Sequence, residues 1–224
     1  MILAAFQRLS ALPDDMVRTA LSGMEPAAKE YLSGARGREK ATGVMMGRDL
    51  LKRLGAALLR REPEQIALEH DAAGRPYLAE TQGQISGGGI LVPPGFCTLS
   101  HSRECVLAAV SDEAPVGCDT DQLRGRAYPV PALTGFFSEK DVEYLSEISD
   151  PAAQRLELTR LWTRKEAVFK LIGKSDRQSL HLCDESRVRD TLGIVFSERI
   201  LDQKEVLTIA VKADDNTRIR WVEV

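Results

Sequence analysis

Long apolar runs, closely spaced cysteines and an excess of positive charge are all missing from this sequence of 224 residues. No run approaches the length of a membrane-spanning segment, so we expect no membrane span and no membrane partner. The formal charge of -3 argues against bulk binding of nucleic acid, which usually needs a basic face. The four cysteines form no CxxC pair and show no zinc spacing, which predicts free thiols in a reducing compartment.

The N-terminal stretch MILAAFQRLSALPDD also lacks the pattern of a secretory signal. It starts with apolar residues, but no basic segment precedes them and no long hydrophobic segment follows. These features predict a cytoplasmic protein. With 43% hydrophobic residues the chain can fill a sizeable core, which argues against a disordered composition.

The patterning predicts a mixed α/β (α+β) fold in two parts. Helices are expected at 38–59, 139–147 and 151–172. The last is the clearest, because Asp150 is a good N-cap, Pro151 a good first residue and Gly173 a good C-cap. Strands are expected at 2–9, 65–70, 96–100, 105–110, 116–121, 192–197, 205–211 and 218–222, the last three as an antiparallel meander. We place an N-terminal subdomain at 1–111 and a C-terminal subdomain at 112–224.

Two carboxylates, Asp119 and Asp121, stand one residue apart in the strand-like stretch VGCDTD. Strand positions i and i+2 point to the same side, so both charges would face one place. Like charges held that close repel unless something positive lies between them. The alternative is that the pair begins a turn or caps a helix.

The long predicted helix carries a third carboxylate. Trp162, Glu166 and Lys170 lie at i, i+4 and i+8, along one stripe. One interpretation is a surface ion pair between Glu166 and Lys170. The other is that Glu166 completes a site with Asp119 and Asp121, because three carboxylates with open water positions suit Mg²⁺, which shares its oxygen ligands with substrate phosphates.

Three smaller features could serve a phosphate-bearing ligand. They are the pair Ser100-His101, the turn Gly74-Arg75-Pro76 and the basic cluster of Arg36, Arg38, Lys40 and Arg48. Each has an ordinary alternative, namely a structural histidine, a simple turn and a solvated helix face. Together with the carboxylates they match a diphosphate-bearing ligand, whose outlying phosphate would be held by cations and whose diphosphate by the metal.

At this point the chain resembles the surfactin-synthetase-type (Sfp-like) 4'-phosphopantetheinyl transferases, over roughly residues 36–175. The motifs that carry the resemblance occur in matching order: Gly74-Arg75-Pro76, Leu99-Ser100-His101, Val116-Gly117-Cys118-Asp119-Thr120-Asp121, Phe137-Ser138-Glu139 and Trp162-Thr163-Arg164-Lys165-Glu166-Ala167-Val168-Phe169-Lys170. The resemblance implies a pseudo-twofold arrangement of two similar α/β subdomains, with coenzyme A in the cleft between them. It also implies a monomer that transfers the 4'-phosphopantetheine arm of coenzyme A to a serine of an acyl, aryl or peptidyl carrier protein and releases 3',5'-adenosine bisphosphate.

The resemblance further implies a role for each matching residue. Mg²⁺ would be bound by Asp119, Asp121 and Glu166, and the catalytic residues would be Glu166 and Lys170. Coenzyme A would be bound by Lys40, Arg48, Arg75, Ser100, His101 and the motif residue Lys165, with the 3'-phosphate held mainly by His101 and Arg75. The family usually has Glu at the position of Asp121, Lys at that of Arg75 and Phe-Asn at that of Cys97-Thr98. The base for the serine proton would be Glu166 or a water held by the metal.

Two other functions are compatible with the same residues. One is a metal-dependent hydrolase of coenzyme A or another nucleotide diphosphate, and the other is a non-catalytic module that binds coenzyme A or a carrier protein. The intact Glu166 and Lys170 argue against the module. The carrier protein is expected to be acidic around its serine, so Arg124 and Arg126 are candidates for docking it.

Overall fold

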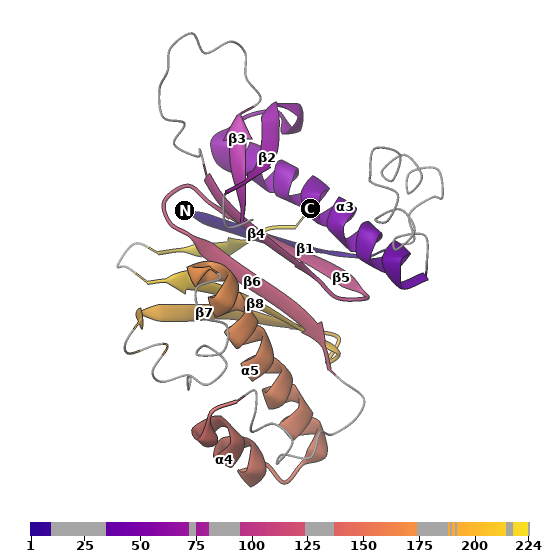
Figure 1. Cartoon of the computed structure of the whole chain (residues 1–224), viewed down its shortest axis with the longest axis vertical. Coiled ribbons are helices and arrows are strands. Elements are labelled where there is room, and N and C mark those ends of the chain that lie inside the picture. The colour runs from indigo at the N-terminus through magenta and orange to yellow at the C-terminus, as the bar shows by residue number, and fades with distance from the viewer. Residues whose placement is uncertain are drawn as a thin grey trace.

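The computed structural model describes residues 1–9, 35–71, 75–80, 95–123, 137–173, 188, 190, 192–213 and 217–223. In these ranges the chain forms two β-sheets and three α-helices, a mixed α+β fold as predicted (Figure 1). The first sheet has the strand order β2 (Ile66–His70), β3 (Pro76–Glu80), β4 (Gly95–His101), β5 (Cys105–Ser111), β1 (Ile2–Arg8) and β9 (Ile219–Trp221). The second has the order β6 (Val116–Gln122), β8 (Glu205–Lys212) and β7 (Ile194–Leu201).

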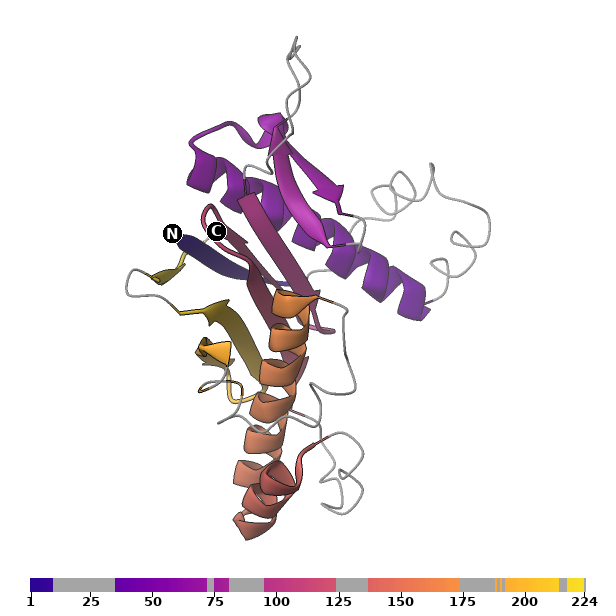
Figure 2. The ribbon, with the colours of Figure 1, turned by 60° about the vertical axis from the view of Figure 1, so that its left-hand side comes forward.

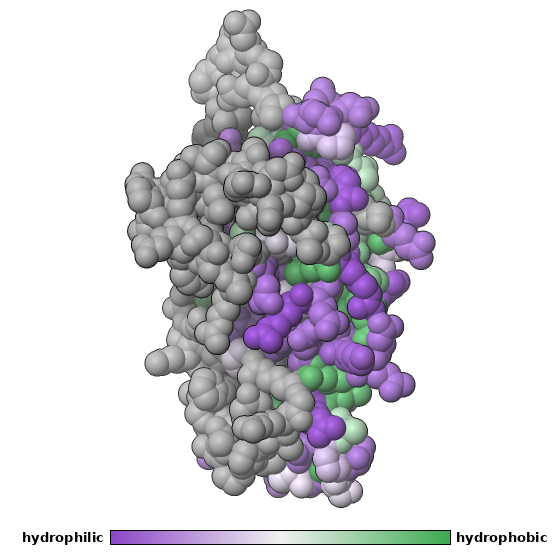
Figure 3. Space-filling view, turned by 90° about the vertical axis from the view of Figure 1, so that its right-hand side faces the viewer, coloured by the Kyte–Doolittle hydropathy of each residue, from purple (hydrophilic) through white to green (hydrophobic). Residues whose placement is uncertain are grey.

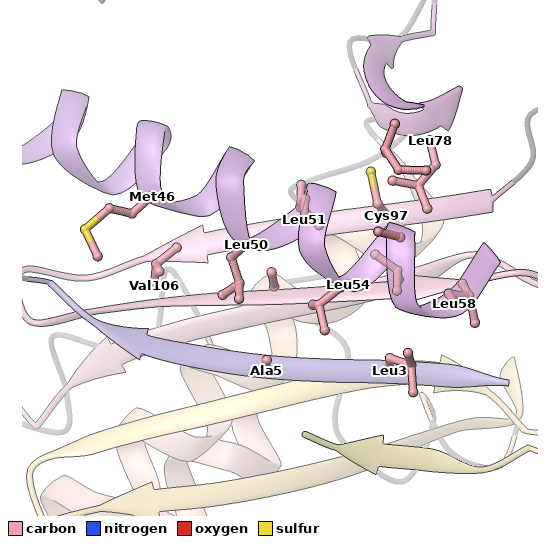
Figure 4. Packing of buried hydrophobic residues seen from close by; sticks show 14 residues of the cluster. Leu3, Ala5, Met46, Leu50, Leu51, Leu54, Leu58, Leu78, Cys97 and Val106 are labelled. Carbon is pink, nitrogen blue, oxygen red and sulfur yellow. The ribbon is translucent and has the colours of Figure 1, made fainter. Parts of the chain in front are cut away.

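Helix α3 (Ala35–Leu59) covers one face of the first sheet, and a short 3-10 turn, η1 (Pro63–Gln65), leads from it to β2. The helix buries the apolar side chains Met46, Leu50, Leu51, Leu54 and Leu58 against strand residues such as Leu3, Ala5 and Val106 (Figure 4). Burial of each large aliphatic side chain contributes about 1.5–3 kcal/mol. This layer fixes the strand β4, which carries Ser100 and His101, beneath α3.

The other face of the first sheet packs on the second sheet. The apolar contact between the two sheets is made by Ile2, Ala4, Leu107 and Ala109 on one side and Val116, Cys118, Leu207, Ile209 and Val211 on the other. Helix α5 (Pro151–Ile172) covers the remaining face of the second sheet, and α4 (Glu139–Glu147) lies near the N-terminal end of α5 (Figures 1 and 2). The strand β6 is therefore covered by β4 and β5 on one side and by α5 on the other.

The helix ends agree with the predicted caps. Asp150 accepts the N–H groups of Ala152 and Ala153, and α5 ends at Ile172 with Gly173 at φ 85°. Ser138 caps α4. The strand β3 was not predicted. The prediction of an antiparallel meander is wrong for β9, which pairs with β1 in parallel and joins the first sheet. The proposed boundary between residues 111 and 112 and the twofold relation of the halves stay predictions.

One face of the molecule exposes little apolar surface among the described residues. On the face in Figure 3 these residues are mostly hydrophilic, and hydrophobic side chains form small patches. Within the described ranges, no helix combines the length and the apolar character needed to cross a membrane. Cys97, Cys105 and Cys118 are buried free thiols, and Cys183 lies outside the described residues.

Candidate active site

The helix α5 approaches the strand β6 at a glycine. An ideal Cβ at Gly117 would lie 2.0 Å from the Ala167 carbonyl oxygen and 2.7 Å from the Leu171 nitrogen, both in the backbone of α5. Only a residue without a side chain allows this approach. Asp119 and Asp121 follow at i+2 and i+4 on the same face of β6, so both carboxylates are on the side that α5 covers.

Asp119 is the point at which three elements meet. Its side chain is buried, and its Oδ1 accepts hydrogen bonds from Ser100 Oγ of β4 and from Lys170 Nζ of α5, each at 2.7 Å. Asp119 and Lys170, two residues predicted for the site in different roles, are thus in contact, and Ser100 of the first sheet contacts the same oxygen. Such charge-assisted bonds are stronger than neutral ones, and they orient the carboxylate.

The negative charges of Asp119 and Glu166 lie close enough to act on each other, which favours a cation beside them. Burial raises the pKa of the Asp119 carboxyl, the Lys170 ammonium and the Ser100 hydroxyl oppose this, and the Glu166 charge adds to it. Burial lowers the pKa of Lys170, but the charge of Asp119, its hydrogen bond to Lys170 and the charge of Glu166 outweigh burial and leave the pKa raised. Both pKa values are raised in part by the charge of Glu166. A second carboxylate nearby makes Asp119 harder to ionise and makes the positive charge of Lys170 more stable.

The donor chemistry of the three carboxylates fits Mg²⁺, which prefers oxygen ligands. Glu166 is buried on α5 and acts electrostatically on Asp119. Asp121 is half-buried, and its Oδ1 accepts the Gln122 backbone N–H at 2.8 Å. Among the described residues, however, no group of three or more His, Cys, Asp or Glu side chains is close enough to hold a metal ion. The cation that the structure places beside Asp119 is the Lys170 ammonium.

His101 lies at the edge of the same cluster. Its ring is packed so closely on α3 that a Cβ at Gly43 would lie 2.6 Å from His101 Cγ. Burial lowers the pKa of His101, a backbone hydrogen bond at Ser102 opposes this, and the positive charges of Lys170 and Lys40 lower it further. The structure therefore brings His101, Lys40 and Lys170 into one electrostatic neighbourhood.

A pocket of about 650 Å³ opens beside this cluster. Its walls come from α3, the strands β2 to β4, the start of β6 and the C-terminal end of α5, and they include the predicted cations Arg48, Arg75 and Lys170. Arg75 donates from Nε to Asp71 Oδ2 at 2.7 Å, and its guanidinium lies next to Gly173. Lys170 thus belongs both to the pocket and to the Asp119 cluster.

Lys165 is placed elsewhere. Its Nζ lies 2.7 Å from Asp141 Oδ2 of α4, with both side chains buried, and 5.6 Å from the centre of the Phe137 ring. The side chain therefore contacts α4. Of the predicted cofactor residues, Arg48 and Arg75 line the pocket, whereas Lys165, Lys40, Ser100 and His101 are not part of its wall. Arg124 and Arg126 and the side chains of Arg36 and Arg38 lie outside the described residues.

Some residues of the site escaped the sequence reasoning. Asp71 forms an ion pair with the guanidinium of Arg75. The spacing of four residues between opposite charges is the sequence feature that could have predicted this pair. Asp141 pairs with Lys165, but nothing in the sequence connects two residues that are 24 positions apart. Gly117 is part of a predicted motif, but the close approach of α5 at this glycine depends on how the helix packs on the strand.

Comparison with known proteins gives the family. The family model described as 4'-phosphopantetheinyl transferase superfamily matches residues 115–219. The 4'-phosphopantetheinyl transferase HetI of Nostoc sp. is 29% identical over 127 residues, which are 57% of this chain and 50% of that protein. The 4'-phosphopantetheinyl transferase AcpT of Escherichia coli is 31% identical over an alignment of 132 residues that covers 54% of this chain and 67% of that protein.

A mammalian protein is similar over more of the chain. The L-aminoadipate-semialdehyde dehydrogenase-phosphopantetheinyl transferase of Mus musculus is 27% identical over an alignment of 199 residues that covers 83% of this chain and 61% of that protein. The chain thus spans about half the length of the Nostoc relative and two thirds of that of the bacterial AcpT. By the family match and the likeness to AcpT, the chain belongs to the 4'-phosphopantetheinyl transferase superfamily.

Proposed function

We propose that this chain is a 4'-phosphopantetheinyl transferase of the surfactin-synthetase type, which moves the arm of coenzyme A to a serine of an apo carrier protein. The observation that carries the proposal is that Ser100 and Lys170 both donate to the buried Asp119 carboxylate, beside a pocket whose wall includes Arg48, Arg75 and Lys170. The names of the relatives support the same activity.

Coenzyme A would lie in the pocket with its 3'-phosphate toward Arg48 and Arg75. Both guanidinium groups are in the pocket wall, and Lys170 is at the end nearest Asp119. His101 and Lys40 lie close enough to Lys170 to act on the same charges. Phosphates favour such clusters of cations, because each hydrogen bond to them is charge-assisted.

Mg²⁺ would be held by Asp119, Asp121 and Glu166, and it would neutralise charge on the diphosphate oxygens. Two of these carboxylates are buried and influence each other, which favours a cation at this place. Ser100 already fixes the orientation of the Asp119 carboxylate.

The remaining chemistry falls to the side chains of α5. The carrier serine attacks the phosphorus that bears the pantetheine arm, the bond to the bridging oxygen breaks, and 3',5'-adenosine bisphosphate leaves. The Lys170 ammonium, which the cluster keeps protonated, would stabilise the negative charge on the phosphate oxygens. Glu166 would accept the proton of the serine hydroxyl. In this scheme Lys165 keeps its ion pair with Asp141 of α4.

The test is to incubate the protein with coenzyme A, MgCl₂ and an acidic apo carrier protein and to measure the mass of the carrier. A gain of one phosphopantetheine arm is expected. Release of nucleotide from coenzyme A without a carrier would indicate the hydrolase, and binding of coenzyme A without any carrier modification would indicate the module. Either result would overturn the proposal.

A further inference from the structure

A pair of threonine hydroxyls connects α5 to the second sheet beside the carboxylates. Thr163 of α5 and Thr208 of β8 are both 0% exposed, and their Oγ1 atoms lie 2.8 Å apart. An apolar cluster that includes Ala167, Val168, Leu171, Ile194 and Ala210 packs α5 on the same sheet. The hydroxyl pair is a buried directional contact between α5 and β8, and on the neighbouring strand β7 Glu198 accepts charged hydrogen bonds from Arg160 and Arg164 of α5.

The pair adjoins the candidate active site on both elements. Thr208 lies opposite Asp119 in the antiparallel β6–β8 ladder, so the two side chains are on one face of the sheet. Helix α5 covers β6 and β8 (Figure 1). Thr163 precedes Glu166 by three residues, which places both on the same side of α5. The hydroxyl bond therefore joins the helical turn that carries Glu166 to the strand beside Asp119.

The hydrogen bonding of the pair is complete in either direction. Thr163 Oγ1 lies 3.1 Å from the Arg160 carbonyl oxygen, and Thr208 Oγ1 lies 3.4 Å from Glu198 Oε1. Whichever hydroxyl donates to the other, the second proton has an acceptor. Loss of one hydroxyl leaves the contact between α5 and β8 without its hydrogen bond in a fully buried layer.

We propose that Thr163 and Thr208 are positioning residues for transfer of the pantetheine arm, an inference that rests on the proposed function. Their bond sets the position of α5 along the sheet. That position brings Glu166 and Lys170 level with Asp119. A displacement of about 1 Å at catalytic groups can reduce the rate about a hundredfold.

The test replaces each threonine by valine, which keeps the branched shape and removes the hydroxyl. For Thr163→Val and Thr208→Val we expect the Mg²⁺ concentration at half-maximal transfer to rise and kcat to fall, each by about tenfold. Calorimetric titration of Mg²⁺ into the complex with coenzyme A should show the same loss of affinity without relying on turnover. The double variant should lose no more than either single variant, because both remove one bond.

Thr159→Val is the matched control. Thr159 is buried on the same helix, but its hydroxyl donates to the Arg155 carbonyl at 2.9 Å within α5 and does not reach the sheet. This variant should keep the kcat and Mg²⁺ affinity of the wild type. Thr208→Ser retains the hydroxyl and should also keep both values. If Thr208→Val does not fold, Thr208→Ala takes its place in the comparison with Thr208→Ser.

The inference is overturned if the valine variants melt at a lower temperature yet keep the Mg²⁺ affinity and kcat of the wild type, since the bond would then be structural only. Equal losses in Thr208→Ser and Thr208→Val would also overturn it. If the wild type transfers no arm, the proposed function fails by itself, and the calorimetric titration still decides the positioning role.

Discussion

Lys170 Nζ lies 2.7 Å from Asp119 Oδ1, which ties the long helix α5 to the strand that carries the carboxylates. The same oxygen accepts the Ser100 hydroxyl from the first sheet at 2.7 Å. One buried carboxylate therefore joins a side chain of the first sheet to a side chain of the helix that covers the second sheet. In the proposed reaction the two charges act on different partners, Lys170 on the diphosphate and Asp119 on Mg²⁺.

Lys170→Met should separate these two roles. We expect kcat for arm transfer to fall about a hundredfold or more, because the phosphate oxygens lose a charged donor. Mg²⁺ affinity should not weaken, because the ammonium no longer pairs with Asp119. Carrier modification gives kcat, and calorimetric titration gives the affinity. Lys212→Met, at the exposed end of β8, is the control, and equal loss of kcat in both variants would contradict the role of Lys170.

Gly117→Ala should displace α5 from β6. The new methyl group would overlap the Ala167 carbonyl oxygen, at 2.0 Å, and backbone cannot move aside as a flexible side chain can. We expect a loss of about 1–3 kcal/mol in the free energy of unfolding, or more, together with most of the transfer activity. Gly55→Ala is the control, because its nearest contacts are side-chain atoms of Leu78 at 3.1 Å. Full activity in Gly117→Ala, measured beside urea unfolding, would show that the close approach is not required.

Lys165→Met should destabilise the protein without weakening the binding of coenzyme A. The variant leaves Asp141 buried beside no ammonium, and breaking a buried pair in this way costs about 3–5 kcal/mol. Adding Asp141→Asn should restore part of the stability, because asparagine removes the unpaired charge. Urea unfolding and the KM for coenzyme A measure the two effects. A large rise in KM with unchanged stability would instead favour a role for Lys165 in the cofactor site.

Glu198 should make stability depend on pH. Burial opposes ionisation, but hydrogen bonds from Arg164 and Arg160 outweigh it and lower the pKa of Glu198 below its ordinary 4.5. The stabilisation is therefore present above pH 4.5 and is lost as pH falls through the lowered pKa. At pH 7, Glu198→Gln should reduce the free energy of unfolding by about 1–3 kcal/mol.

The free energies of unfolding of Glu198→Gln and the wild type should become more similar as the pH is lowered below 4.5. Urea unfolding of both proteins at each pH measures this difference. Asp112→Asn, at the exposed end of the first sheet, is the control for a surface carboxylate. A difference that stays constant down to the acid limit would contradict the assignment of the pKa shift to Glu198.

The sequence predicted those parts of the fold that local chemistry decides. The caps at Asp150 and Gly173 gave both ends of α5, and the alternation around Asp119 and Asp121 gave their common face. The strand β3 was missed because it begins at Pro76, in a segment that looks like a turn. The pairing of β9 with β1 could not be predicted, since it depends on which sheet edge is open in the folded chain.

For the site, too, the sequence predicted what local motifs determine and missed what depends on tertiary packing. The motifs named Asp119, Lys170 and Arg75, and the basic cluster named Arg48. The structure places Asp119 and Lys170 in contact, and it places Lys170, Arg48 and Arg75 around one pocket. The position of Lys165 was not predictable, because its partner Asp141 is on a different helix. The close approach at Gly117 likewise depends on the packing of α5, which no local pattern describes.

The role of Asp119 is tested most directly by the mass of an apo carrier protein after incubation with coenzyme A, MgCl₂ and either the wild type or Asp119→Ala. We predict a gain of one phosphopantetheine arm with the wild type and none with the variant. Binding of coenzyme A by the variant, followed by calorimetry, should survive in part, because Arg48 and Arg75 are unchanged. Full transfer by Asp119→Ala, or no transfer by the wild type, would contradict the proposal.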